Sequence, residues 1–226
     1  TQVPASPQNS VPAPAVDLGE IEVVGRPLDA MIQAFVNEVA APNRHRGIAR
    51  WDRDICIGVA NLRPDTAQFL VDRVSAVAED VGLNPGLPGC NPTVIIIASD
   101  DPDGLAATLT HQQRRAFRRG GSGMDRGRPA LQRTFVASDR PARWRQVSMP
   151  TDSETGQRAV RIPGECLSPC MSPEDYAPTI AVFAASNLST QIVDNLTRAI
   201  IILDIDQVGN VSGQQLADYI ALITLA

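Results

Sequence analysis

The chain has 226 residues, of which 43% are hydrophobic and 4% aromatic, and its net charge at pH 7 is −5. This length suits one domain, and the scarcity of aromatic rings predicts a core of Ile, Val, Leu and Ala. The negative charge argues against a nucleic-acid binder, because affinity for phosphates is electrostatic at root. No run of roughly 18 apolar residues is present, so we expect no transmembrane helix in this chain.

The first 20 residues differ in composition from the remainder. They are rich in Pro, Ser, Ala and Gln and carry almost no charge, and such a segment buries too little apolar surface to offset its chain entropy. We therefore expect an extended arm over residues 1–20 and a single globular domain over residues 21–226. The stretch TQVPASPQNSVPAPA is typical of a mature terminus left by signal cleavage, and the apolar ending at Ala226 suggests that the polypeptide continues.

The first half of the domain alternates strands with helices. IEVVG at 21–25 predicts a short strand and residues 28–40 an amphipathic helix, followed by a strand over 54–62. Pro64 and Asp65 then open a helix over about 65–82. Its inward face is predicted to contain Phe69, Leu70, Val74, Val77 and Val81.

The second half mixes buried strands with a hairpin. TVIIIASD at 93–100 has the continuous β-branched pattern of a strand covered on both faces, and Asp101 caps a short helix after it. Residues 144–150 and 158–163 predict a hairpin joined by DSETGQ, and a short helix is expected to begin near Ser189. A buried strand at 199–205 and a closing helix complete an α+β fold, close to α/β, with one mixed sheet covered by helices.

Four cysteines, Cys56, Cys90, Cys166 and Cys170, are present in a chain that looks secreted. An even number of cysteines in such a chain favours two disulfides, Cys56–Cys90 and Cys166–Cys170, in an oxidising compartment. Metal binding by the four thiolates is the alternative. We predict a periplasmic or secreted protein.

Paired acids follow two of the predicted buried strands. Asp100 and Asp101 end IIIASDD, and Asp204 and Asp206 end IIILDID. Open α/β sheets bind ligands at the carboxyl ends of their strands. If these two strands are neighbours, the four carboxylates form a site for a divalent cation.

The same closing stretch can also be compared with a calcium loop. Its fifth position is Val208, and its twelfth is Gln215 in place of the bidentate Glu. A turn at Gly209, followed by a capping box between Ser212 and Gln215, accounts for the pattern without a ligand.

The most unusual local feature is an Arg-rich segment over residues 111–145. It contains ten Arg and two Asp, a net charge of +8 in a chain that is acidic overall. The segment is either a solvated face or a docking surface for an acidic protein, an anionic lipid or another phosphate-bearing polymer. The partner-binding candidates are Arg114, Arg115, Arg118, Arg119, Arg126 and Arg128, and peripheral membrane association is included in this interpretation.

The closing helix GQQLADYIALITLA, together with the order of strand, helix, strand, further strands and helix, resembles the core of the zincin metallopeptidases. On that comparison Gln215 and Tyr219 occupy the positions of the two zinc-binding His, and Leu216 that of the catalytic Glu. The resemblance implies a zincin-like fold without the peptidase chemistry, because the HExxH motif is absent. The chain also resembles secreted bacterial proteins of unknown function that end in a QLADY-type helix.

These observations lead to two hypotheses. The first is a non-catalytic extracytoplasmic bacterial protein that serves as an interaction or accessory subunit of an envelope assembly, with another envelope protein as partner and no cofactor. The second is a hydrolase or metal-binding protein whose site combines His45 with the carboxylates at the strand ends. The lack of a complete catalytic motif favours the first hypothesis.

Overall fold

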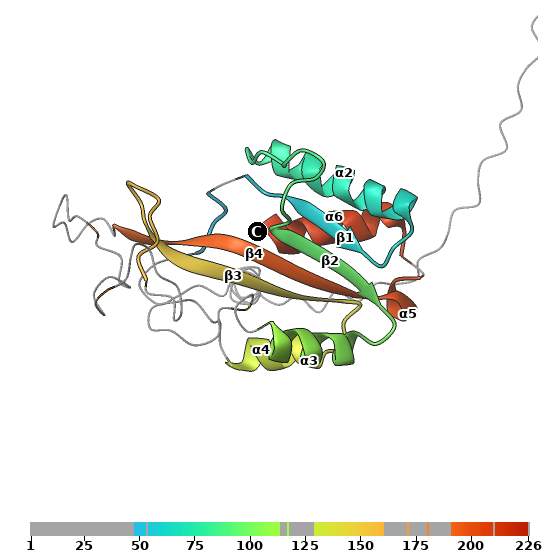
Figure 1. Ribbon diagram of the computed structural model, residues 1–226. Helices are drawn as coiled ribbons and strands as arrows, with labels where there is room; N and C mark the ends of the chain where they lie inside the picture. The colour runs from blue at the N-terminus through green and yellow to red at the C-terminus, as the bar shows by residue number, and fades with distance from the viewer. Residues whose placement is uncertain are drawn as a thin grey trace, which may run out of the picture.

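A four-stranded mixed sheet organises the domain (Figure 1). The computed structural model describes residues 48–52, 54–113, 117, 129–160, 171, 180, 191–209 and 211–225. The strands lie in the order β1 (Ile57–Ala60), β2 (Val94–Ser99), β4 (Ile192–Asp204) and β3 (Ala142–Asp152). The first three are parallel, and β3 runs antiparallel to β4 at one edge. The predicted α+β fold with a mixed sheet is confirmed.

Helices cover both faces of this sheet, as Figure 1 shows. Helix α2 (Pro64–Asp80) packs beside α6 (Gly213–Leu225) on one face. The opposite face is covered by α3 (Pro102–Gln112) and α4 (Pro129–Val136), and the short α5 (Ile205–Val208) leads from β4 toward α6. None of the described helices combines the length and apolar character that a membrane crossing requires.

Strand β4 divides the apolar core into two layers. Ile201 and Leu203 belong to the cluster on the α2 and α6 side, whereas Ile200 and Ile202 belong to the cluster that contains Phe135 of α4. Successive side chains of a strand point to opposite faces, so a strand covered on both faces is apolar at every position. The run AIIIL therefore positions β4 at the centre of the domain.

Helix α2 confirms the predicted element and corrects part of its inward face. Leu70, Val74 and Ala78 form the buried stripe, at a spacing of four residues. Phe69 is 44% exposed and Val81 is 61% exposed, so the prediction that both point inward is wrong. A buried stripe repeats every three to four residues, and Phe69 lies one position to the side of it.

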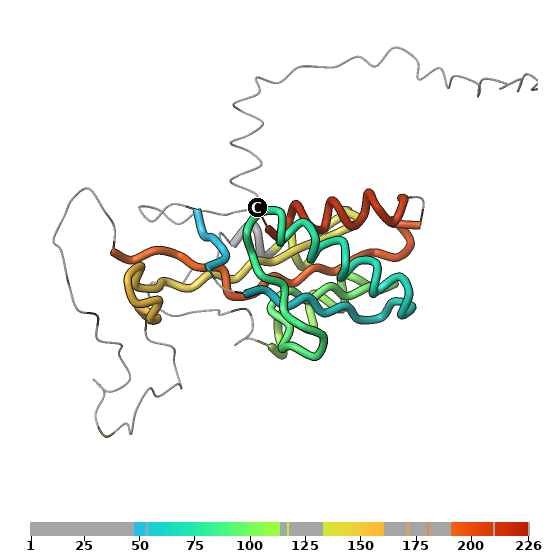
Figure 2. Tube along the Cα trace, turned by 90° about the horizontal axis from the view of Figure 1, so that it is seen from above, coloured from blue at the N-terminus to red at the C-terminus, as the bar shows by residue number. Residues whose placement is uncertain are grey.

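The beginning of β4 was predicted wrongly. A helix was expected near Ser189, but the strand begins at Ile192 and pairs with the end of β3, where Met149 lies opposite Asn195. Because this part of β4 has a long antiparallel partner, cross-strand pairing decides its conformation. As Figure 2 shows, β3 and β4 continue beyond the helices.

The predicted hairpin is confirmed at its turn. Thr151 bridges Arg158 in antiparallel fashion, and the amide of Ala159 donates to the carbonyl of Pro150 at 2.8 Å. Residues 161–163 lie outside the described part of the chain. The same holds for the predicted arm, the predicted strand at 21–25 and the predicted helix at 28–40.

Asp152 organises the turn that follows β3. Its side chain is buried and accepts hydrogen bonds from the amides of Glu154 and Thr155, at 3.0 and 2.7 Å, and from the side chain of Gln191 at 2.6 Å. The Thr155 amide is the largest of the causes that lower the pKa of Asp152 below its usual value. These donors favour the ionised carboxylate.

Asp152→Asn should therefore lower the free energy of unfolding in a pH-dependent way. The stabilisation from the ionised carboxylate is complete above the pKa of Asp in the unfolded chain, about 3.9, and is lost as pH falls through the lower folded value. Urea denaturation of the wild type and the variant should show a difference in the free energy of unfolding at pH 7, and this difference should become smaller below about pH 4. The control is Asp139→Asn, at an exposed position. Its free energy of unfolding should equal that of the wild type at every pH. A difference for Asp152→Asn that stays constant down to acidic pH would contradict this assignment.

Candidate functional site

The two acidic strand ends meet at one edge of the sheet. Strands β2 and β4 are parallel neighbours, and Ser99 lies opposite Asp204 in their register. Asp100 and Asp101 therefore follow the end of β2 at the same edge of the sheet where Asp204 ends β4. Asp206 lies two residues beyond the end of β4. The adjacency that the cation hypothesis requires is present.

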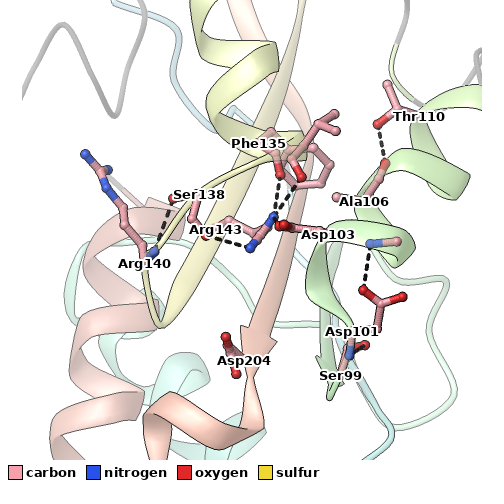
Figure 3. A network of polar contacts seen from close by, with 12 residues as sticks. Ser99, Asp101, Asp103, Ala106, Thr110, Phe135, Ser138, Arg140, Arg143 and Asp204 are labelled. Atoms are coloured by element: carbon pink, nitrogen blue, oxygen red, sulfur yellow. Dashed lines mark hydrogen bonds and ion pairs between the residues drawn. The ribbon is translucent and has the colours of Figure 1, made fainter.

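Two of the four carboxylates at this edge cap helices. Asp101 accepts a hydrogen bond from the amide of Gly104 at 2.9 Å and so caps α3. Asp204 accepts from the amide of Asp206 at 3.0 Å and from Nε2 of Gln207 at 2.8 Å at the start of α5. Both interactions satisfy amides that have no partner within their helix. In Figure 3 the two side chains stand on separate elements, with Asp101 directed toward α3.

Glycine at position 104 leaves room for the Asp101 carboxylate in this cap. A Cβ atom there would contact Oδ2 of Asp101. Any other residue would therefore require the carboxylate to shift. The conformation of Asp101 is thus explained by local helix geometry.

The predicted metal cluster does not form. Among the residues that the structure describes, no group of three or more His, Cys, Asp and Glu side chains is placed to hold a metal ion. Asp100, Asp101, Asp204 and Asp206 are all within that part. The physical reason is that Asp101 and Asp204 each turn onto the helix that follows their own strand. His45 lies outside the described residues.

A buried arginine lies close to this edge, at the centre of Figure 3. Arg143 of β3 is 3% exposed and forms an ion pair with Asp103 of α3. Its guanidinium also donates to the carbonyls of Val136 at 2.9 Å and Ser138 at 2.7 Å, and more weakly to that of Phe135. These acceptors are at the carboxyl end of α4, so Arg143 joins α3, α4 and the sheet.

The Arg-rich segment is therefore not a uniform surface. Arg143 and Arg145 are buried, whereas Arg133 and Arg140 are exposed. Arg143 and Arg145 occupy alternate positions of β3 and share one face of it, while the other face packs against α6. The sequence alone does not distinguish these buried arginines from the exposed ones, because the burial depends on the position of β3 in the fold. The six partner-binding candidates, Arg114, Arg115, Arg118, Arg119, Arg126 and Arg128, lie outside the described residues.

The predicted Cys56–Cys90 disulfide is confirmed. It links residues 34 positions apart, with Cα atoms separated by 6.0 Å, and joins the segment before β1 to the loop before β2. A disulfide fits a protein of an oxidising compartment. Cys166 and Cys170 lie outside the described residues, so their pairing stays a prediction.

The three positions that the zincin comparison singles out take part in the capping and packing of α6. Gln215 forms the predicted capping box with Ser212, whose amide and hydroxyl both donate to its side-chain oxygen. In return, the amide of Gln215 donates to the Ser212 hydroxyl at 3.2 Å. Leu216 packs against the core, and Tyr219 contacts Trp144 of β3. Each of the three has a structural role in α6.

A surface that the sequence did not reveal lies where α6 meets β3. We call Arg140, Trp144, Tyr219 and Leu222 the aromatic surface. The rings of Trp144 and Tyr219 meet edge to face at 6.4 Å, and the guanidinium of Arg140 lies 5.4 Å from the Trp144 ring centre. Tyr219 is 37% exposed, and Leu222, one turn further on, is 49% exposed.

The helical spacing of Tyr219 and Leu222 was the available signal for this surface. Residues three apart share one face of a helix, and the buried residues of α6 are Ala217, Ile220, Ala221, Ile223 and Thr224. Tyr219 and Leu222 are not among them. The contribution of Trp144 required the strand pairing, which the sequence does not contain.

Comparison of the chain with protein-family models, with curated proteins and with solved structures finds no match.

Proposed function

We propose that this chain is a non-catalytic extracytoplasmic bacterial protein that acts as an interaction or accessory subunit of an envelope assembly. The observation that carries the proposal is the aromatic surface. Trp, Tyr and Arg are the residues enriched at the energetic centres of protein interfaces, and here all three lie together with an exposed Leu. The Cys56–Cys90 disulfide supports a periplasmic or secreted location.

The chemistry of this surface defines the partner it fits. Aromatic rings and Leu222 offer an apolar contact, and Arg140 adds a positive charge that lies over Trp144. An apolar segment of another protein with an acidic residue at its margin would match both features, since charge complementarity adds specificity to apolar burial. We therefore propose an envelope protein that presents such a segment.

The zincin-like core also belongs to this proposal. Its support is the order of the elements. A strand, a helix and a strand are followed by two helices, an antiparallel edge strand, a central strand, the short α5 and the closing helix. A zincin-like scaffold with Gln215, Leu216 and Tyr219 in place of the catalytic set would serve as a binding module.

Site-specific photo-crosslinking in the native bacterium tests the interaction. A photoreactive amino acid at Leu222 should give one discrete adduct with an envelope protein. The same amino acid at Thr108, an exposed position of α3 on the opposite face, should not give that adduct. Arg140→Glu should reduce the adduct at position 222 about tenfold, because a charge reversal opposite an acidic residue costs at least 1.4 kcal/mol. Failure to form an adduct at 222, or an identical adduct at 108, would refute the proposal.

A further inference from the structure

A cavity of about 300 Å³ lies beyond the carboxyl end of α6. Four extended segments form it side by side. The segment from Arg50 runs along β4, with the Leu196 amide donating to the Arg50 carbonyl at 2.7 Å. On the other side of β4 lies β3, and then the segment of Arg158, which bridges Thr151. This volume is at the lower end of the range for small-molecule sites.

Opposite charges line the two sides of the cavity. Asp52 and Asp54 line it from the first segment, and Arg158 lines it from the last. The backbones of these segments are three strand spacings apart, roughly 14 Å. Acidic and basic lining on opposite sides of one cavity matches a small molecule that carries both charges.

Apolar side chains also line the cavity. They belong to Trp51, Met149 and Leu196, and the remaining lining includes Thr93, Thr151, Asn195 and Thr197. Trp51 is fixed in place, since its Nε1 donates to the carbonyl of Thr224, the penultimate residue of α6, at 2.8 Å. Apolar walls with a few placed polar groups are the usual composition of a ligand site.

The charged walls are held by their own hydrogen bonds. Asn195 of β4 donates through Nδ2 to the carboxylate of Asp52, and Asn84 donates to Asp54 at 3.2 Å. The turn organised by Asp152 sets the position of the Arg158 segment, because the Asp152 amide donates to the carbonyl of Gln157 at 2.8 Å. Such positioning lowers the entropic cost of binding.

From this arrangement we infer that the cavity binds a zwitterion with an apolar side chain, either a free amino acid or a very short peptide. The ammonium group is bound by Asp52 and Asp54, the carboxylate by Arg158, and the side chain by Trp51 and Met149. Charge-assisted hydrogen bonds at both ends orient the molecule. This inference does not depend on the aromatic surface or on its partner.

Isothermal titration calorimetry with L-leucine and with L-leucyl-L-leucine tests it. We expect saturable binding of one of the two at millimolar concentration or below, and the tighter ligand distinguishes a free amino acid from a peptide. N-acetyl-L-leucine lacks the ammonium group, and L-leucine amide lacks the carboxylate. Each should bind about tenfold more weakly than L-leucine, the effect of losing one charge-assisted contact.

Variants locate the site. Arg158→Gln and Asp52→Asn should each weaken binding about tenfold for the same reason. Arg63→Gln is the matched control, because Arg63 is exposed at the start of α2 and pairs with Asp65 away from the cavity. Absence of saturable binding by both probes would overturn the inference. Equal binding of L-leucine and its acetylated form would also overturn it, and that measurement needs no variant.

Discussion

Replacement of Cys56 and Cys90 by alanine is expected to lower the free energy of unfolding by about 4 kcal/mol, the loop-entropy value for a closed loop of this size. The bond joins residues separated by 34 positions. The folded loop has other contacts, because the Gly86 amide donates to the carbonyl of Ile55 at 2.7 Å and the Ile55 amide donates to that of Asn84 at 3.1 Å. Most of the effect should therefore arise in the unfolded chain.

Urea denaturation of the wild type and the double variant measures this difference. Adding a reductant to the wild type should produce a similar loss. Any further loss when the double variant is reduced would report a second disulfide, between Cys166 and Cys170. A double variant as stable as the wild type would show that the bond adds nothing to the native contacts of Ile55.

The sequence predicted the elements whose evidence is local. Strands β1 and β2 and helix α2 follow from β-branched runs, from a Pro and an Asp at the start of a helix, and from an apolar repeat that includes Leu70 and Val74. The capping box of Ser212 and Gln215 was also predicted, since both partners are three residues apart. Local patterns of this kind are independent of the remainder of the chain.

The errors occur where a distant segment decides the conformation. The first half of β4 was predicted to be part of a helix. It is a strand, because β3 pairs with it. The helix α4 was not predicted, because its surroundings are dominated by Arg and Gly. Its last carbonyls are satisfied by Arg143, a residue beyond its end in the sequence. Neither partner can be recognised from propensity alone.

The candidate site shows the same division. The cation hypothesis assumed that the two acidic strand ends are adjacent. They are, because the parallel strands at 94–99 and 199–204 are neighbours in the sheet. Their carboxylates were nevertheless predicted to share a cation, and Asp101 and Asp204 cap helices instead. The aromatic surface and the cavity were missed, because both combine residues that are far apart in the sequence.

Arg143→Leu is the substitution within the fold with the largest expected effect after loss of the disulfide. The guanidinium is buried and donates to carbonyls at the end of α4, at Val136 and Ser138. Leucine leaves these partly buried acceptors without their donor. Since each unsatisfied buried group costs about 1–3 kcal/mol, we expect a loss of about 3 kcal/mol.

Two further variants separate the parts of this network. Arg143→Lys keeps the charge but cannot reproduce the fork of donors, so it should lose about half of that amount. Asp103→Asn should lose at most about 1 kcal/mol, because Asp103 is 64% exposed and its charge is screened by solvent. The expected order of stability in urea is therefore wild type, Asp103→Asn, Arg143→Lys and Arg143→Leu. If Asp103→Asn proves as costly as Arg143→Leu, the ion pair and not the capping of α4 is the main contribution of Arg143.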